Sequence, residues 1–256
     1  MEKLLLDEFT QPEISERIRN CDIAFFPVGT QEGHGPLMPL GTDMYIASAV
    51  AAMTAREMGG IALHPLAYSF TGATNGYRGT VSIPMSLETE VIKAVIRNLW
   101  AQKFRRIFIL NVHGPNDIPI KMAIRELFEY KKIIAAYYNP YTSVSAAEYN
   151  YDDCAKETAM CHAAMKVLGK EECIPRNSGQ EDVPYPPLNL PGFDKEGLVT
   201  GFHYNQLYQH QPPRKVDIAT GMVLLESAVT QLIELLEQLK EYVTFIEKGG
   251  NHPYSI

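Results

Sequence analysis

Short apolar runs alternate with longer amphipathic stretches through the first half of the chain, and this alternation limits the possible fold more than any other feature. We predict strands at 23–28, 61–66, 107–112 and 133–138, and helices between them at 44–58, 87–104 and 118–130. Ser86 is the predicted N-cap of the second of these helices. Strands separated by helices favour right-handed β-α-β units and a parallel sheet covered on both faces. The predicted fold class is therefore α/β, a three-layer sandwich with a mostly parallel central sheet.

The second half of the chain has a different composition. Helices are predicted at 154–168 and from 216 to 245, and between them seven of the 17 prolines fall within 175–213. So many prolines preclude long regular helices. We interpret 175–213 as an irregular, proline-rich excursion that forms a lid or a subunit contact. No internal repeat or linker is evident, so residues 1–256 are predicted to form a single domain.

Composition and charge exclude several classes of partner. The net charge of -7 provides no basic surface for nucleic acid. No apolar run approaches the roughly 20 residues needed to cross a bilayer, and the first residues include acids too early for a signal peptide. The four cysteines show no CxxC pair. We expect reduced thiols, a cytoplasmic location, and no nucleic-acid or membrane partner.

Metal-binding residue types gather directly after the first predicted strand. Glu32, His34 and Asp43 lie in a segment rich in glycine and proline. Glu32 and His34 are two residues apart, so in an extended segment their side chains point to the same side. His113 follows the third predicted strand, and ligands of parallel sheets gather at the carboxyl ends of the strands. The pattern predicts that these side chains converge on a divalent cation.

Each of these residues also has a simpler structural interpretation. Asp43 alone would be read as a helix N-cap, and Glu157 as a solvated carboxylate on a helix. Arg78 suits a structural salt bridge as well as it suits a substrate contact. Asp152 begins a predicted helix, where acidic residues are common, but it could also transfer protons.

Two strings of residues together resemble the creatininase (creatinine amidohydrolase) family. Glu32-Gly-His34-Gly-Pro-Leu-Met-Pro-Leu-Gly-Thr-Asp43 is similar to the family string Glu-x-His-Gly-Pro-x-x-Pro-x-Gly-Thr-Asp. Asn111-Val-His113-Gly-Pro-Asn116 is similar to its Asn-Gly-His-Gly-Gly-Asn. Weaker similarities follow at Glu157-Thr-Ala159 and in the last predicted helix, where Gly221 is out of step with the family pattern. The resemblance covers most of the chain.

The resemblance implies two divalent metal ions, commonly zinc or manganese, with iron also compatible with the ligand types. Glu32 and His113 would hold one ion and His34 the other, with Asp43 bridging them. The creatinine hydrolases carry a further carboxylate two residues after His113, where this chain has Pro115. Glu157 is predicted to complete the second set instead. A metal-bound hydroxide would then open a small cyclic substrate at an amide or related C–N bond.

Departures from the family pattern bear on the substrate. Trp100 is the one tryptophan of the chain, whereas tryptophans are expected over the substrate of creatinine hydrolases. Thr71 and Arg78 replace an expected serine and proline, and Asp152 replaces a histidine thought to act as an acid or base. Creatinine is therefore an improbable substrate.

The predicted roles follow from these departures. We predict substrate contacts from Thr71 and Arg78 and catalytic roles for Asp152 and Glu157. Two alternatives remain open: hydrolytic C–C cleavage of a cyclic ketone such as a dehydro-cyclitol, and a catalytically silent metal-binding assembly protein. The resemblance also implies a homo-oligomer, a hexamer in the family.

Overall fold

The computed structural model describes residues 3–35, 37–76, 78–175 and 216–249, and its centre is a parallel sheet. The strand order is β2-β1-β3-β4. The strands are β1 (Ile23–Val28), β2 (Ile61–Ala62), β3 (Arg106–Asn111) and β4 (Ala136–Tyr138). All three pairings are parallel, with Ile23 opposite Arg106 and Val28 opposite Asn111. The predicted α/β sandwich with a parallel central sheet is confirmed.

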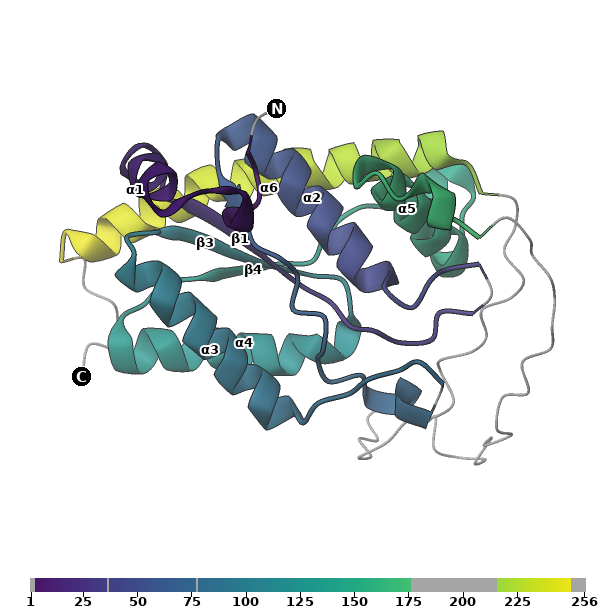
Figure 1. The fold of residues 1–256 in the computed structure, drawn as a ribbon, viewed down its shortest axis with the longest axis horizontal. Coiled ribbons are helices and arrows are strands. Elements are labelled where there is room, and N and C mark those ends of the chain that lie inside the picture. The colour runs from purple at the N-terminus through teal and green to yellow at the C-terminus, as the bar shows by residue number, and fades with distance from the viewer. Residues whose placement is uncertain (1–2, 36, 77, 176–215, 250–256) are drawn as a thin grey trace.

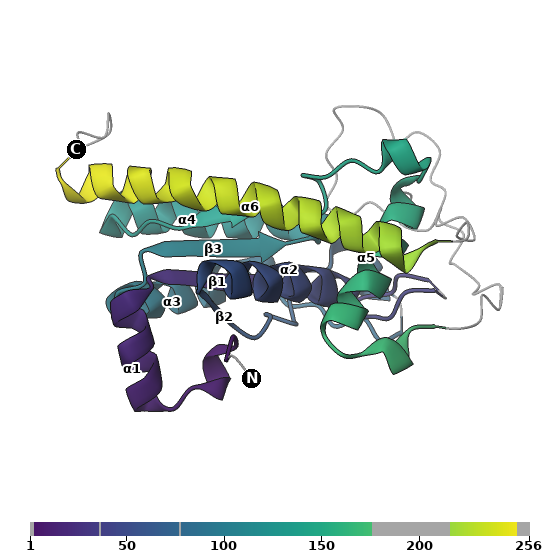
Figure 2. The ribbon, with the colours of Figure 1, turned by 90° about the horizontal axis from the view of Figure 1, so that it is seen from above.

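Helices cover both faces of the sheet (Figures 1 and 2). They are α1 (Gln11–Asn20), α2 (Thr42–Met58), α3 (Met85–Ala101), α4 (Asp117–Lys131), α5 (Asp153–Val167) and α6 (Ile218–Glu247). One core joins α2, α5 and α6 to Phe25, and the other joins α3 and α4 to Phe26. Successive strand residues point to opposite faces, so the uninterrupted apolar run in β1 serves both cores.

Several element bounds differ from the prediction. The predicted strand 61–66 pairs regularly only over Ile61–Ala62, because Pro65 has no N–H to donate; a single bridge joins Leu66 to Val28. Helix α3 begins at Met85 after Pro84, so Ser86 lies inside the helix and is not its N-cap. Helix α1 was not predicted, although Thr10 and Glu13 form a capping box at its start. Apart from its first residue, the predicted excursion 175–213 lies outside the described residues.

Helix α6 is the longest element of the described chain, and it packs on α5, α2 and β3. Among the described residues it is the one helix that is long and apolar enough to cross a bilayer. Its buried side, which includes Leu224, Leu232 and Leu236, faces the core. Glu226 and Glu234 are exposed on its other side. Those contacts are typical of a core helix in a sandwich.

Gly221 brings α6 very close to α5. A Cβ atom built at Gly221 would lie 2.0 Å from the backbone oxygen of Ala159. Real Cβ contacts are never so short, so a side chain here would force the two helices apart. The glycine that departs from the family pattern is therefore required by the contact between α5 and α6.

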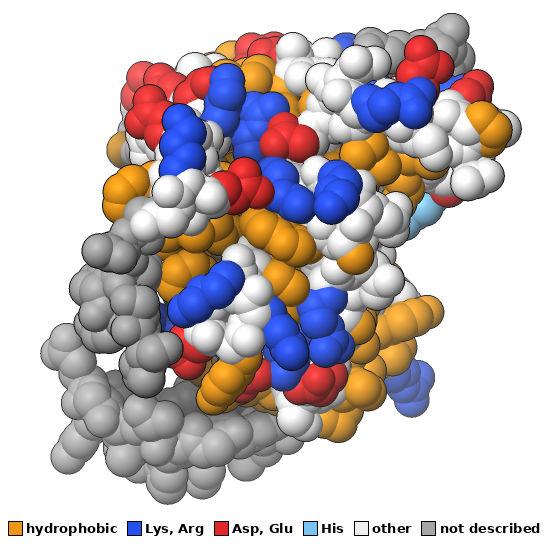
Figure 3. Space-filling view, turned by 90° about the vertical axis from the view of Figure 1, so that its left-hand side faces the viewer, with side chains coloured by type: hydrophobic (Ala, Val, Ile, Leu, Met, Phe, Trp, Pro, Cys, Tyr) orange, Lys and Arg blue, Asp and Glu red, His pale blue; other side chains and the backbone are white. Residues whose placement is uncertain are grey.

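Charges of both signs are interleaved at the end of the molecule where β3 begins and α6 ends (Figure 3). Arg105 pairs with Glu247 at 2.9 Å, and Arg106 pairs with Asp22 at 2.6 Å. These pairs tie the end of α6 and the start of β1 to the start of β3. The acidic and imidazole groups described below lie at the opposite end of the strands.

Candidate metal centre

Five side chains from four separate parts of the chain meet beyond the carboxyl ends of β1 and β3. Glu32 and His34 lie in the loop after β1, Asp43 is the second residue of α2, His113 follows β3, and Glu157 lies on α5. They form two groups of three, each with its ligand-type atoms within 4.8 Å of one another: Glu32, Asp43 and His113, and His34, Asp43 and Glu157. The structure thus brings together every residue that the sequence predicts as a metal ligand.

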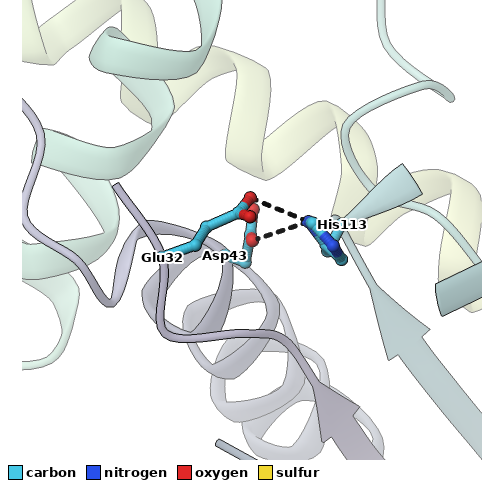
Figure 4. A group of neighbouring side chains, drawn as sticks. All are labelled: Glu32, Asp43 and His113. Carbon is cyan, nitrogen blue, oxygen red and sulfur yellow. Dashed lines mark ion pairs between the residues drawn. The ribbon is translucent and has the colours of Figure 1, made fainter. Parts of the chain in front are cut away.

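The first group is drawn in Figure 4. Nδ1 of His113 lies 2.9 Å from Oε1 of Glu32 and 3.4 Å from Oδ2 of Asp43. The three side chains are between 1% and 5% exposed. A buried concentration of two carboxylates and one imidazole is chemically suited to a divalent cation.

The second group shares Asp43 with the first. Nε2 of His34 lies 3.6 Å from Oδ1 of Asp43 and 3.9 Å from Oε1 of Glu157. Asp43 therefore turns one carboxylate oxygen toward His34 and the other toward His113. This division of its two oxygens is the geometry that a bridging carboxylate requires.

The proton equilibria of the cluster show how strongly it favours positive charge. Burial alone would lower the pKa of His34, but the negative charge of Asp43, with that of Glu157 and Glu32, outweighs burial and raises it to about 10. The pKa of His113 is likewise raised to about 10, chiefly by Glu32 and Asp43 against the opposing effect of burial. Burial would raise the pKa of Asp43, but the two histidines hold it below its usual range.

An orphaned atom tests whether a cation fits. Oδ2 of Asp43 is buried and, although it lies 3.4 Å from Nδ1 of His113, it has no hydrogen-bond partner among the described residues, whereas such atoms are almost always satisfied. Burial, together with the negative charges of Asp43 and Glu32, raises the pKa of Glu157 to about 7, against the opposing effect of His34. The donor set of carboxylates and imidazoles without thiolates fits zinc, manganese or iron(II). The residues therefore fit divalent cations.

Hydrogen bonds with surrounding residues orient the side chains of the two three-residue groups. Nδ1 of His34 binds the backbone oxygen of Glu32 at 3.1 Å, and Nε2 of His113 binds that of Phe70 at 3.1 Å. In each ring the other nitrogen faces the acids. The hydroxyl of Thr74 donates to Oε2 of Glu32. Contacts of this kind fix the tautomer and orientation of a metal-binding histidine.

The other predicted site residues lie outside the two groups of three. Thr71 is 1% exposed, and its hydroxyl has no hydrogen-bond partner among the described residues. Arg78 is exposed. Asp152 is exposed and caps α5, where its carboxylate accepts a hydrogen bond from the amide of Ala155 at 2.8 Å. Asp152 is therefore absent from both three-residue groups, and its acid/base role stays a prediction.

Glu88 is a buried carboxylate near the centre that the sequence analysis did not select. It lies in the first turn of α3, is 0% exposed, and accepts a hydrogen bond from the amide of Phe70 at 2.8 Å. Burial raises its pKa to about 7, against the opposing effects of that amide and of His113. Acids are favoured in the first turn of a helix whether or not they are buried, so nothing in the sequence indicates that Glu88 is buried.

In the metal-free protein, Glu88→Gln should stabilise the fold by about 2–3 kcal/mol more at about pH 8 than at about pH 5. The pKa of Glu88 is raised from 4.5 to about 7, so between these values the folded state holds more protons than the unfolded state. The stability that this carboxyl contributes therefore falls as the pH rises through that window. Glutamine keeps an oxygen for the amide of Phe70 and removes the charge.

Urea unfolding of metal-free protein at both pH values measures this difference. Glu90→Gln, which alters an exposed carboxylate of the same helix, is the control and should show no pH-dependent gain. Equal gains for Glu88→Gln at both pH values would contradict the prediction.

The chain is similar to several known proteins. A family model described as "Creatininase: Creatinine amidohydrolase" matches residues 7–166. The chain is 31% identical over 129 residues to the 3-dehydro-scyllo-inosose hydrolase of Thermotoga maritima, covering 49% of this chain and 41% of that protein. It is 26% identical over 151 residues to the creatinine amidohydrolase of Pseudomonas putida, covering 53% and 58%.

A third relative has another substrate in its name. The mycofactocin precursor peptide peptidase of Mycolicibacterium smegmatis is 35% identical over 104 residues, covering 38% of this chain and 42% of that protein. The chain spans about half the length of the curated relatives that it matches.

Solved structures share the fold. A crystal structure of creatinine amidohydrolase superposes with a TM-score of 0.73 at 21% identity, covering 93% of this chain and 98% of that chain. A structure described as "Creatininase Mn" gives a TM-score of 0.69 at 19% identity, with the same coverage.

Proposed function

Since this chain belongs to the creatininase family, we propose that it is a metal-dependent hydrolase that opens a small cyclic substrate. The observation that carries the proposal is the position of Asp43, which is shared by two buried groups of metal-ligand side chains. Divalent cations held there would supply a nucleophile from water at neutral pH and polarise a substrate carbonyl.

The residues have separate roles in this proposal. Glu32 and His113 would hold one ion and His34 and Glu157 the other, with Asp43 between them. Thr74 would keep Glu32 in place through its second carboxylate oxygen. Because most of the cluster is nearly inaccessible to solvent, the surroundings would strengthen the electrostatic interactions with a bound substrate.

We propose a ring opened by hydrolysis at a C–N bond of a cyclic amide. Water adds its oxygen to the carbonyl carbon, the C–N bond breaks, and the nitrogen takes the proton. The second candidate is C–C cleavage of a cyclic ketone, in which the leaving carbon takes the proton. Two observations favour this alternative: one relative is named a hydrolase of 3-dehydro-scyllo-inosose, and the unpartnered buried hydroxyl of Thr71 could bind a hydroxylated ring.

The test is to incubate protein loaded with zinc or manganese with a panel of cyclic amides, including creatinine, and of dehydro-cyclitols. Mass spectrometry would detect ring-opened acids. Opening of either class supports a hydrolase and selects between the two reactions. Turnover of creatinine at a typical enzymatic rate would refute the prediction that creatinine is an improbable substrate. If metal binds but no ring is opened, the alternative of a silent metal-binding assembly protein is favoured.

Thr71→Val should separate substrate binding from stability. Valine has nearly the shape of threonine and removes a buried hydroxyl without a partner, so the free energy of unfolding should stay equal or rise. If the hydroxyl binds substrate, kcat/KM should fall roughly tenfold, the value of about one hydrogen bond.

Steady-state kinetics with the ring that the substrate panel identifies would measure the loss of kcat/KM. Urea unfolding would measure the free energy of unfolding. The matched control is Thr54→Val, which alters a buried threonine of α2 whose hydroxyl donates to the backbone oxygen of Val50. The control should lose stability and keep its kinetics. Unchanged kinetics in Thr71→Val would remove this residue from the substrate site.

A further inference from the structure

His113 must leave one ring nitrogen free of hydrogen if it is to bind a cation. Its Nδ1 faces Glu32 and Asp43, and its Nε2 lies 3.1 Å from the backbone oxygen of Phe70. A carbonyl oxygen only accepts hydrogen bonds. Nε2 therefore carries the hydrogen and donates it to Phe70, which leaves Nδ1 available to the cation.

The backbone of Phe70 is also held through its amide, one peptide group before the carbonyl that faces His113. Its amide donates to Oε2 of Glu88 at 2.8 Å. The neighbouring residues are held by the loop before α3, because Ile83 donates to the backbone oxygen of Ser69 and Thr71 donates to the hydroxyl of Ser82. Phe70 is thus the residue of this segment that depends on a buried side chain of α3.

The charge of Glu88 has no evident structural need. Among the residues that the structure describes, no Lys, Arg or His nitrogen lies within 4.0 Å of its carboxylate. Burying such a group without a cation is costly, and an apolar side chain could fill the same space. The amide and the carbonyl of Phe70 belong to successive peptide groups. An acceptor on the amide therefore acts by restraining the backbone of Phe70, and with it the direction of the carbonyl that accepts from His113.

A second contact joins Glu88 to the end of β3. With its amide turned so that both ends are satisfied, Asn116 donates to Oε1 of Glu88 at 3.3 Å and to the backbone oxygen of Phe70 at 3.2 Å. Asn116 ends the short turn that His113 begins. Glu88, the backbone of Phe70 and the turn after His113 therefore form one connected network.

We propose that Glu88 is a positioning residue, which fixes the orientation of His113 through the backbone of Phe70. The inference rests on the proposed function, because it takes His113 to be a metal ligand. It adds a role for a residue that touches neither the ions nor the substrate.

The experiment compares Glu88→Gln, which keeps an acceptor for the amide of Phe70, with Glu88→Met, which has similar length and no such acceptor. Zinc affinity is measured by competition with a chromophoric chelator. Glu88→Met should bind zinc about tenfold more weakly, the low end of the effect of outer-shell contacts, whereas Glu88→Gln should stay near wild type. Glu90→Met, on the exposed side of the same helix, is the control and should also stay near wild type.

A spectroscopic measurement separates positioning from a general loss of structure. In protein with ¹⁵N-labelled histidine, the Nε2–H signal of His113 should be protected and far downfield in the wild type and in Glu88→Gln. In Glu88→Met it should shift or exchange rapidly with water. If Glu88→Met does not fold, Glu88→Asp replaces it, because the shorter carboxylate is withdrawn from the amide of Phe70; the same loss of affinity is expected.

Unchanged zinc affinity and an unchanged His113 signal in Glu88→Met would overturn the inference. So would an equal loss of affinity in Glu90→Met. A wild-type protein that fails to bind zinc or manganese would instead contradict the proposed metal centre, so the two failures are distinguishable.

Discussion

Asp43→Asn should abolish the binding of a pair of metal ions and reduce hydrolysis by roughly a thousandfold or more, because the water nucleophile and the polarised carbonyl both depend on those ions. Asp43 contributes to both three-residue groups, with one oxygen near His34 and the other near His113. Asparagine has the same size, but it lacks the charge and places an N–H where an oxygen is needed.

Metal content by mass spectrometry and turnover of the ring-opening reaction test this prediction together. The control is Asp22→Asn, which breaks the ion pair with Arg106 at the other end of the strands and should keep both metal and activity. An Asp43→Asn protein with two bound ions and wild-type turnover would contradict the proposed arrangement.

Loading the protein with its metal should raise the free energy of unfolding by about 4 kcal/mol when free metal is about 1,000 times its dissociation constant. For a chain of this size the melting temperature should then rise by about 8–16 °C. The reason is that the ligands come from four elements that meet only in the folded chain, so the unfolded state cannot bind the ions in the same way.

Thermal unfolding with metal and with a chelator measures the rise in melting temperature. Asp43→Asn is the control, and its melting temperature should change little when metal is added. A melting temperature that does not respond to zinc, manganese or iron(II) would contradict a metal centre at this position.

The pH dependence of the metal-free protein has a defined sign. The pKa values of His34 and His113 are raised from 6.5 to about 10, so these imidazoles bind protons more tightly in the folded state. Their contribution to stability is complete below about pH 6.5 and is lost as the pH rises toward 10. Because a metal must displace these protons, metal affinity should increase over the same window.

The sequence predicted those parts of the fold that depend on local patterns. The uninterrupted apolar run of β1 gave both of its ends correctly, because each residue is buried in one of two cores. The predicted extent of the second strand was wrong, because Pro65 has no N–H to continue the pairing with β1, although the apolar pattern continues. Helix α1 has a capping box and two apolar residues one turn apart, Ile14 and Ile18, which are only partly buried against the second core. So short an apolar pattern was not recognised as a helix.

The residues of the candidate metal centre could also be predicted only in part from local sequence patterns. The convergence of Glu32 and His113 could be predicted because both follow strands of a parallel sheet. The position of Glu157 required the resemblance, because it depends on how α5 packs on α2. The burial of Glu88 could not be predicted. This residue lies in the first turn of α3, and it is buried because the segment around Phe70 passes over it.

The close approach of α6 to α5 at Gly221 has a consequence for Glu157, which precedes Ala159 by half a turn on α5. The distance of this carboxylate from His34 is set by the helix behind it as well as by its own. Substitutions at position 221 would therefore shift Glu157 relative to His34 from a distance, so a residue that contributes no side chain at all would help to set the geometry of the proposed metal centre.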